Sequence, residues 1–178
     1  MAIDLKGLNP PFLIHSDISY MSNFIKKKFN NKIKKHEFLK FHFDFLSETF
    51  GIGDIAFPAF NYEFPKSKVF HLKNTQSQVG ALTNYVLKSD CFVRTKTPIF
   101  SFLVGTNQPS EFSQYPFSSN SYFNYLYDND GTIVFYGAKY NTATYLHFVE
   151  SQFGPPRYRY DKCFKGSIIN DELVTPVE

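Results

Sequence analysis

A histidine and a glutamate three residues apart form the clearest candidate for acid–base chemistry in this chain. His147 and Glu150 lie in the segment NTATYLHFVE, which begins at Asn141. Residues at this spacing are neighbours on a helix surface, so a helix here would hold the imidazole beside the carboxylate. An imidazole with a pKa of about 6.5 accepts a proton at neutral pH, and the glutamate would orient the ring. Taken alone, such a pair is more often an ordinary feature of a helix surface.

A strand followed by a helix must position this pair. The β-branched and aromatic run at 132–136 predicts a buried core strand, closed by Gly137. The period then becomes helical, with Asn141 or Thr142 as the expected cap. Four residues share one side of this predicted helix: Thr144, His147, Phe148 and Ser151.

A second strand-to-helix junction is expected near the N-terminus. The apolar run at 12–14 predicts a strand that leads directly into His15-Ser16-Asp17-Ile18-Ser19, where Ser16 or Asp17 would cap a helix. The backbone N–H groups of such a junction suit a phosphate or another anion. An ordinary capped helix explains the same residues about equally well.

The segments between the two junctions predict alternating helices and strands. An amphipathic helix is expected after the lysine-rich residues 26–35, with Phe38, Phe41, Phe45 and Leu46 facing the core. We expect His36 and His42 at its surface or partly buried. A strand follows at 55–57, a helix from Thr75 or Ser77 to about Ser89, and a strand at 99–104 that Arg94 precedes in a turn. For residues 108–124 we expect a long loop or short helical pieces that could form one wall of a pocket.

Composition indicates one folded domain spanning residues 1–178. The sequence is 43% hydrophobic and 19% aromatic, which excludes a disordered chain. A net charge of +3 gives no reason to infer nucleic-acid binding. Two isolated cysteines favour a reduced, cytoplasmic protein without a metal site, and no run is long enough for a membrane span. The sequence is compatible with a homo-oligomer and does not determine the oligomeric state.

These motifs together resemble the aminoglycoside 3-N-acetyltransferases, also called the antibiotic N-acetyltransferase family. Four segments carry the resemblance in order: the His15–Ser19 segment, DIAFPAFNY at 54–62, SQVGALTNY at 77–85 with Arg94, Thr95 and Pro98, and residues 130–150. The similarity extends roughly from Pro11 to Tyr160. It implies a three-layer α/β/α sandwich, distinct from the Gcn5-related fold.

The resemblance also implies a reaction and a set of site residues. It predicts an N-acetyltransferase that uses acetyl-CoA, without a metal, to acetylate an amino group of an amino sugar. His147 would be the base, with Glu150 and Asn141 beside it. The expected cofactor-binding residues come from the other segments: His15, Ser16, Ser19, Ser77, Val79, Gly80, Arg94 and Thr95.

The acceptor and the completeness of the chain are separate questions. A polycationic aminoglycoside favours an acidic pocket, whereas this chain is mildly basic, so a nucleotide-linked amino sugar for surface polysaccharide is the favoured acceptor. The Thr97-Pro98-Ile99-Phe100-Ser101 segment lacks the two histidines usual in the family. Because family members usually continue well past residue 178, we expect a short or truncated member. The alternative function is a relative that binds CoA or a partner without turnover.

Overall fold

The computed structural model describes residues 5–22, 33–154, 157, 162–171 and 173–177. A five-stranded sheet with the order β4-β5-β2-β1-β6 forms its centre. Strands β1 (Phe12–Ser16), β2 (Ile55–Pro58) and β6 (Thr132–Tyr136) are parallel. Strands β5 (Phe102–Gly105) and β4 (Phe92–Arg94) extend the sheet in antiparallel pairs. The three parallel strands therefore end at one edge of the sheet.

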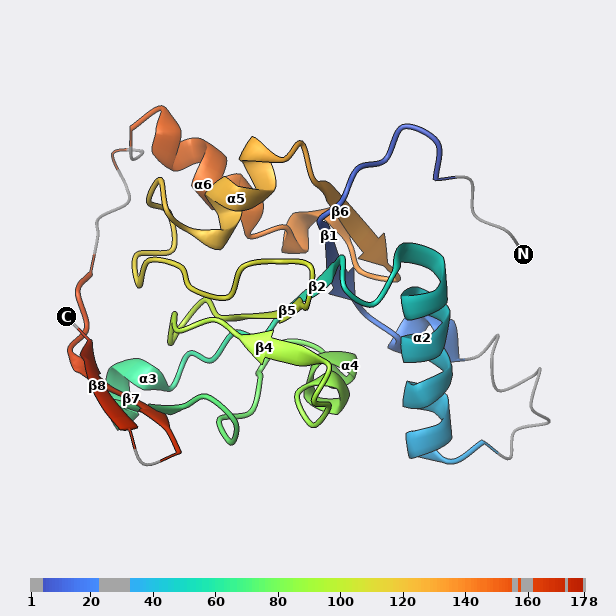
Figure 1. The fold of residues 1–178 in the computed structure, drawn as a ribbon, viewed down its shortest axis with the longest axis horizontal. Coiled ribbons are helices and arrows are strands. Elements are labelled where there is room, and N and C mark those ends of the chain that lie inside the picture. Colours follow the sequence, from blue (N-terminus) through green and yellow to red (C-terminus); the bar gives the residue numbers. More distant parts are fainter. Residues whose placement is uncertain (1–4, 23–32, 155–156, 158–161, 172, 178) are drawn as a thin grey trace.

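Helices cover both faces of this sheet, which gives the expected α/β/α arrangement (Figure 1). On one face, α2 (Lys35–Phe50) and α4 (Ala81–Val86) pack against Phe12 and Ile14. On the other face, α5 (Tyr122–Asp128) and α6 (Tyr145–Gln152) pack around Leu13. The uninterrupted apolar run of β1 follows from burial on both faces, which is typical of a central parallel strand.

A smaller sheet lies apart from the five-stranded sheet. It consists of β3 (Val69–His71), β7 (Gly166–Asn170) and β8 (Leu173–Val177), in that order. The short helix α3 (Phe64–Ser67) lies beside it (Figure 1). Phe64, Phe70 and Ile168 form the centre of a separate apolar cluster there.

Several sequence expectations are wrong in detail. Strand β6 is not a core strand but the edge of its sheet, and none of its residues is fully buried. Arg94 ends β4 instead of lying in a turn. Helix α4 begins only at Ala81, after Gly80, and ends at Val86, so Val79 precedes it. These differences arise because strand pairing and burial depend on residues distant in sequence.

The buried face of α2 is also shifted from the expected one. Leu39, His42, Leu46 and Phe50 are its buried residues, and the exposed fraction of His42 is 0%. The His42 Nδ1 lies 2.6 Å from the hydroxyl of Tyr136, whose ring packs nearby. His42 was expected at the surface or partly buried, and it is instead fully buried in the contact between α2 and β6.

No helix in the described ranges is both long and apolar enough to cross a membrane.

Candidate functional site

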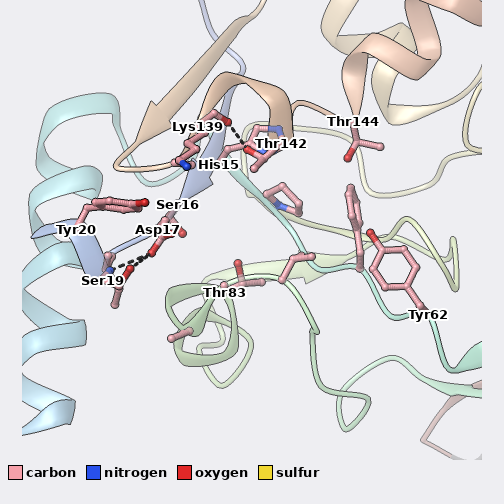
Figure 2. A pocket seen from close by; sticks show the side chains of 17 residues that line it. His15, Ser16, Asp17, Ser19, Tyr20, Tyr62, Thr83, Lys139, Thr142 and Thr144 are labelled. Atoms are coloured by element: carbon pink, nitrogen blue, oxygen red, sulfur yellow. Dashed lines mark hydrogen bonds between the residues drawn. The ribbon is translucent and has the colours of Figure 1, made fainter. Parts of the chain in front are cut away.

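A pocket of about 750 Å³ opens where the parallel strands end (Figure 2). His15 and Ser16 from the end of β1 and Pro58 from the end of β2 line it. In an open α/β sheet, the crevice beyond the carboxyl ends of strands is the usual place for a ligand. Seventeen residues line the pocket in total: His15, Ser16, Asp17, Ile18, Ser19, Tyr20, Pro58, Phe60, Tyr62, Val79, Gly80, Ala81, Thr83, Ala138, Lys139, Thr142 and Thr144.

Figure 2 shows that the pocket is elongated. Ser19 and Tyr20 lie at one end, and Tyr62 and Thr144 lie at the other. The loop after β6 supplies Lys139 and Thr142 between them. The pocket therefore suits an extended ligand with an apolar section and several hydrogen-bonding groups.

The turn after β1 is held by Asp17. Its Oδ1 accepts hydrogen bonds from the backbone N–H of Ser19 at 3.1 Å and from the Ser19 hydroxyl at 2.5 Å. Residues 19–22 are helical, so Asp17 fulfils the expected capping role. The Asp17 N–H in turn donates to the carbonyl of Tyr136 at 2.9 Å, which joins this turn to the end of β6.

Two glycines bring the surrounding loops close to that turn. Gly137 follows β6 at a φ of +71°, and a Cβ there would overlap the backbone of Asp17. Gly80 precedes α4 at a φ of +79°, with the Ser16 hydroxyl 3.5 Å from the position of a Cβ. Because L-residues with a side chain rarely adopt these angles, glycine suits both loop positions.

His15 is the most buried titratable group of the pocket. Its exposed fraction is 6%, and its ring stacks on Phe135 with the centroids 5.7 Å apart. Burial lowers the pKa of His15 from 6.5 to about 4, so the ring is neutral at physiological pH. Within the described part of the chain, its Nε2 has no hydrogen-bond partner. His15 is therefore a poor proton acceptor and contributes an uncharged polar group to the wall of the pocket.

The His147–Glu150 pair forms as expected on α6 but does not line the pocket. The His147 Nδ1 lies 3.3 Å from the Glu150 Oε2, and both side chains are partly exposed. Thr144, three residues before His147, does line the pocket. Asn141 lies in an exposed 3-10 turn (Tyr140–Thr142), and Thr144 occupies the N-cap position of α6 without a side-chain capping bond. The expected cap at Asn141 or Thr142 is therefore wrong.

The expected cofactor-binding residues divide into two groups. His15, Ser16, Ser19, Val79 and Gly80 all line the pocket. Ser77 and Thr95 are instead buried in local backbone contacts, since the Ser77 hydroxyl bonds to the backbone of Val79 and the Thr95 hydroxyl accepts from the N–H of Phe102.

Arg94 also lies outside the pocket lining, with an exposed fraction of 6%. Its guanidinium donates to the carbonyls of Ala59, Leu72 and Thr75 and to the Ser101 hydroxyl. It also lies 4.5 Å from the centre of the Phe70 ring. Burial lowers the pKa of Arg94 to about 10, so it stays charged at neutral pH. Arg94 therefore joins the end of β4 to the segments that follow β2 and β3 and to Ser101, which precedes β5.

Sequence reasoning missed four polar residues of the pocket, namely Tyr20, Tyr62, Thr83 and Lys139. Lys139 follows the carboxyl end of a parallel strand. Because ligands usually bind beyond such strand ends, this position could have identified Lys139 as a candidate pocket residue from the sequence. Asp17 is the single carboxylate among the lining residues and Lys139 the single lysine. Among the described residues, no cluster of three or more His, Cys, Asp or Glu side chains is arranged to hold a metal.

Comparisons with known proteins agree with this architecture. Residues 44–175 match the sequence model described as aminoglycoside 3-N-acetyltransferase, a range that begins after His15–Ser19. No curated protein sequence matches the chain.

Solved structures show the same fold at low sequence identity. The apoenzyme of aminoglycoside acetyltransferase AAC(3)-IVa is 16% identical with a TM-score of 0.68, over 96% of this chain and 63% of that one. AAC-IIIb in a binary complex with CoASH is 14% identical with a TM-score of 0.68, over 95% and 68%. The YokD protein from Bacillus subtilis is 18% identical with a TM-score of 0.64, over 96% and 74%. The chain thus spans about two thirds of the length of these neighbours.

Proposed function

Because the chain belongs to the aminoglycoside 3-N-acetyltransferase family, we propose that it transfers the acetyl group of acetyl-CoA to an amino group of an amino sugar. One observation carries the proposal. Four separate segments of the sequence resemblance contribute to a single elongated pocket at the carboxyl ends of β1, β2 and β6, through residues at 15–19, 58–62, 79–83 and 138–144. Segments that are distant in the sequence can contact one ligand only if the fold brings them together, as it does in this pocket.

In this proposal the pocket holds the acyl-pantetheine arm. The hydroxyls of Ser16, Thr83 and Thr142 would bind its amides, and Val79 would contact its apolar section. The acetyl thioester would lie at the Thr144 end. Lys139 supplies one positive charge to the pocket, and acetyl-CoA, the cosubstrate, would supply the activated acetyl group.

His147 is the proposed general base. An amine attacks the thioester carbon only through its lone pair, so one proton must leave the nitrogen as the C–N bond forms and the C–S bond breaks. With Nδ1 hydrogen-bonded to Glu150, the Nε2 of His147 is the atom that accepts this proton. Asn141 would orient the acceptor near the start of α6.

The charges of the pocket support an anionic acceptor such as a nucleotide-linked amino sugar. Its lining has a single carboxylate, Asp17, and Oδ1 of this group already accepts two hydrogen bonds from Ser19. A polycationic aminoglycoside would find few partners there, whereas Lys139 would attract a phosphate.

The position of His147 favours a second candidate function, because this residue does not line the pocket. In that case the protein binds CoA without turnover. A thiol-release assay with acetyl-CoA separates the two. We would offer nucleotide-linked amino sugars and aminoglycosides, including apramycin and sisomicin, which are bound in neighbouring solved structures.

The transfer proposal predicts turnover with at least one of these acceptors and a loss of about 10²- to 10⁴-fold in His147→Ala. Full activity in His147→Ala would exclude this residue as the base. CoA binding without turnover on any acceptor would establish the second function instead.

A further inference from the structure

A second hollow lies on the other side of α4 from the pocket, between α4, the first half of α2 and the segment after β3. Its volume is about 1000 Å³, and we call it the basic groove. Thirteen residues line it: Lys35, His36, Leu39, Phe43, Lys73, Asn74, Gln76, Ala81, Asn84, Tyr85, Leu87, Lys88 and Ser89. None of these lining residues is acidic. The charged side chains among its lining residues are therefore the three lysines Lys35, Lys73 and Lys88.

Two of the three lysines are available to a ligand. Lys73 forms an ion pair with Asp171 at 2.8 Å, so its charge is partly neutralised. Lys35 and Lys88 are exposed and make no ion pair with any other residue in the described ranges. Lys35 lies on α2 and Lys88 follows α4, so they face the groove from different elements.

The groove also has an aromatic wall. The Tyr85 ring lies 5.5 Å from the His36 ring and 6.0 Å from the Phe43 ring, measured between centroids. Leu39 and Leu87 add apolar surface beside them. A planar base can stack on such a wall, whereas a free phosphate gains nothing from it. The exposed amides of Asn74 and Gln76 can hydrogen-bond to the edge of a base or to a ribose.

The frame of the groove is fixed by hydrogen bonds. The Asn84 side chain accepts from the Ser77 N–H at 2.8 Å and donates to the Ser77 carbonyl at 2.7 Å. These bonds tie α4 to the segment that leads into it. The wall of the groove that α4 and residues 76–77 form is therefore held in place by these bonds.

We propose that the basic groove binds a nucleoside diphosphate moiety, with its base against Tyr85 and His36 and its phosphates against Lys35 and Lys88. Ala81, the first residue of α4, lines both the groove and the pocket. One ligand extending across Ala81 therefore reaches both. The same chemistry occurs in CoA and in a nucleotide-linked sugar, and either is a source of the bound group. The proposal concerns binding alone and stands without the transfer reaction.

Calorimetric titration of the full chain at low ionic strength tests this proposal. The probes are ADP, UDP, 3′-phosphoadenosine 5′-phosphate and inorganic pyrophosphate. We expect the nucleotides to bind more tightly than pyrophosphate, because only they use the aromatic wall. Tighter binding of 3′-phosphoadenosine 5′-phosphate than of UDP would identify CoA as the source. The reverse order would identify the sugar nucleotide.

Charge-neutralising variants locate the site. The double variant Lys35→Gln/Lys88→Gln should weaken nucleotide binding about tenfold, the combined effect of two partly exposed ion pairs. Lys66→Gln removes the same charge at an exposed position on α3 and should leave binding unchanged. Equal affinities of the double variant and the wild type would overturn the proposal. So would no binding of any nucleotide, or pyrophosphate binding as tightly as ADP. Turnover is measured separately, so a failure here leaves the transfer reaction intact.

Discussion

Acidification should destabilise this protein through His15, and the size of the effect follows from its burial. Burial, which leaves only 6% of His15 exposed, disfavours the charged imidazole and lowers its folded-state pKa from 6.5 to about 4. Between these two pH values the unfolded chain binds a proton that the folded chain does not. The contribution of the neutral His15 ring to the free energy of unfolding is therefore complete above about pH 6.5 and is lost as the pH falls towards 4.

A shift of this size corresponds to about 3 kcal/mol of unfolding free energy. Other groups titrate in the same range, and burial also lowers the pKa of His42. The contribution of His15 is therefore the difference between the wild type and His15→Asn, measured by urea unfolding at several pH values. That difference should shrink by about 3 kcal/mol between pH 7 and pH 4.

His36→Gln is the matched control, because His36 is exposed on the first turn of α2. Its substitution removes a histidine without opening the core. A wild-type-minus-His15→Asn difference that stays constant over the whole pH range would contradict a buried neutral imidazole at position 15.

Three further substitutions probe the frame of the site. Arg94→Met should cost about 3–5 kcal/mol of unfolding free energy, since three backbone carbonyls lose a buried donor, and Arg94→Lys should not restore it. An Arg94 variant that keeps its thermal stability but binds CoA weakly would instead support a cofactor contact. Gly80→Ala should cost about 1–2 kcal/mol in a thermal melt because of the positive φ, and should raise the KM for acetyl-CoA. Unchanged stability and KM would show that residue 80 relaxes freely. Tyr136→Phe removes the hydrogen bond to His42 and should lower the free energy of unfolding in urea by about 1–3 kcal/mol. The control Tyr140→Phe changes an exposed tyrosine and should leave this free energy unchanged.

The sequence predicts those strands and helices whose own residues show the typical pattern of apolar residues. The apolar run of β1 and the change of period between β6 and α6 are both present in the structure. The edge position of β6 could not be predicted, because it depends on which strands pair and not on its own residues.

The resemblance grouped His15, Ser16, Ser19, Val79 and Gly80 as cofactor-binding residues, and the structure brings these five into the lining of one pocket. Their contact with a ligand stays a prediction. The environment of Arg94 depends on carbonyls at Ala59, Leu72 and Thr75, which are distant in sequence and carry no side-chain signal. The basic groove combines residues of α2 with residues that follow β3 and α4, so only the tertiary structure brings its charges together.

A crystal structure of this chain with bound CoA would locate the proposed site of acetyl transfer. We expect the pantetheine arm to lie in the pocket beside Ser16 and Gly80, with its sulfur at the Thr144 end, towards His147. CoA bound with its sulfur outside this pocket, or at the Ser19 end, would contradict the proposed site of acetyl transfer.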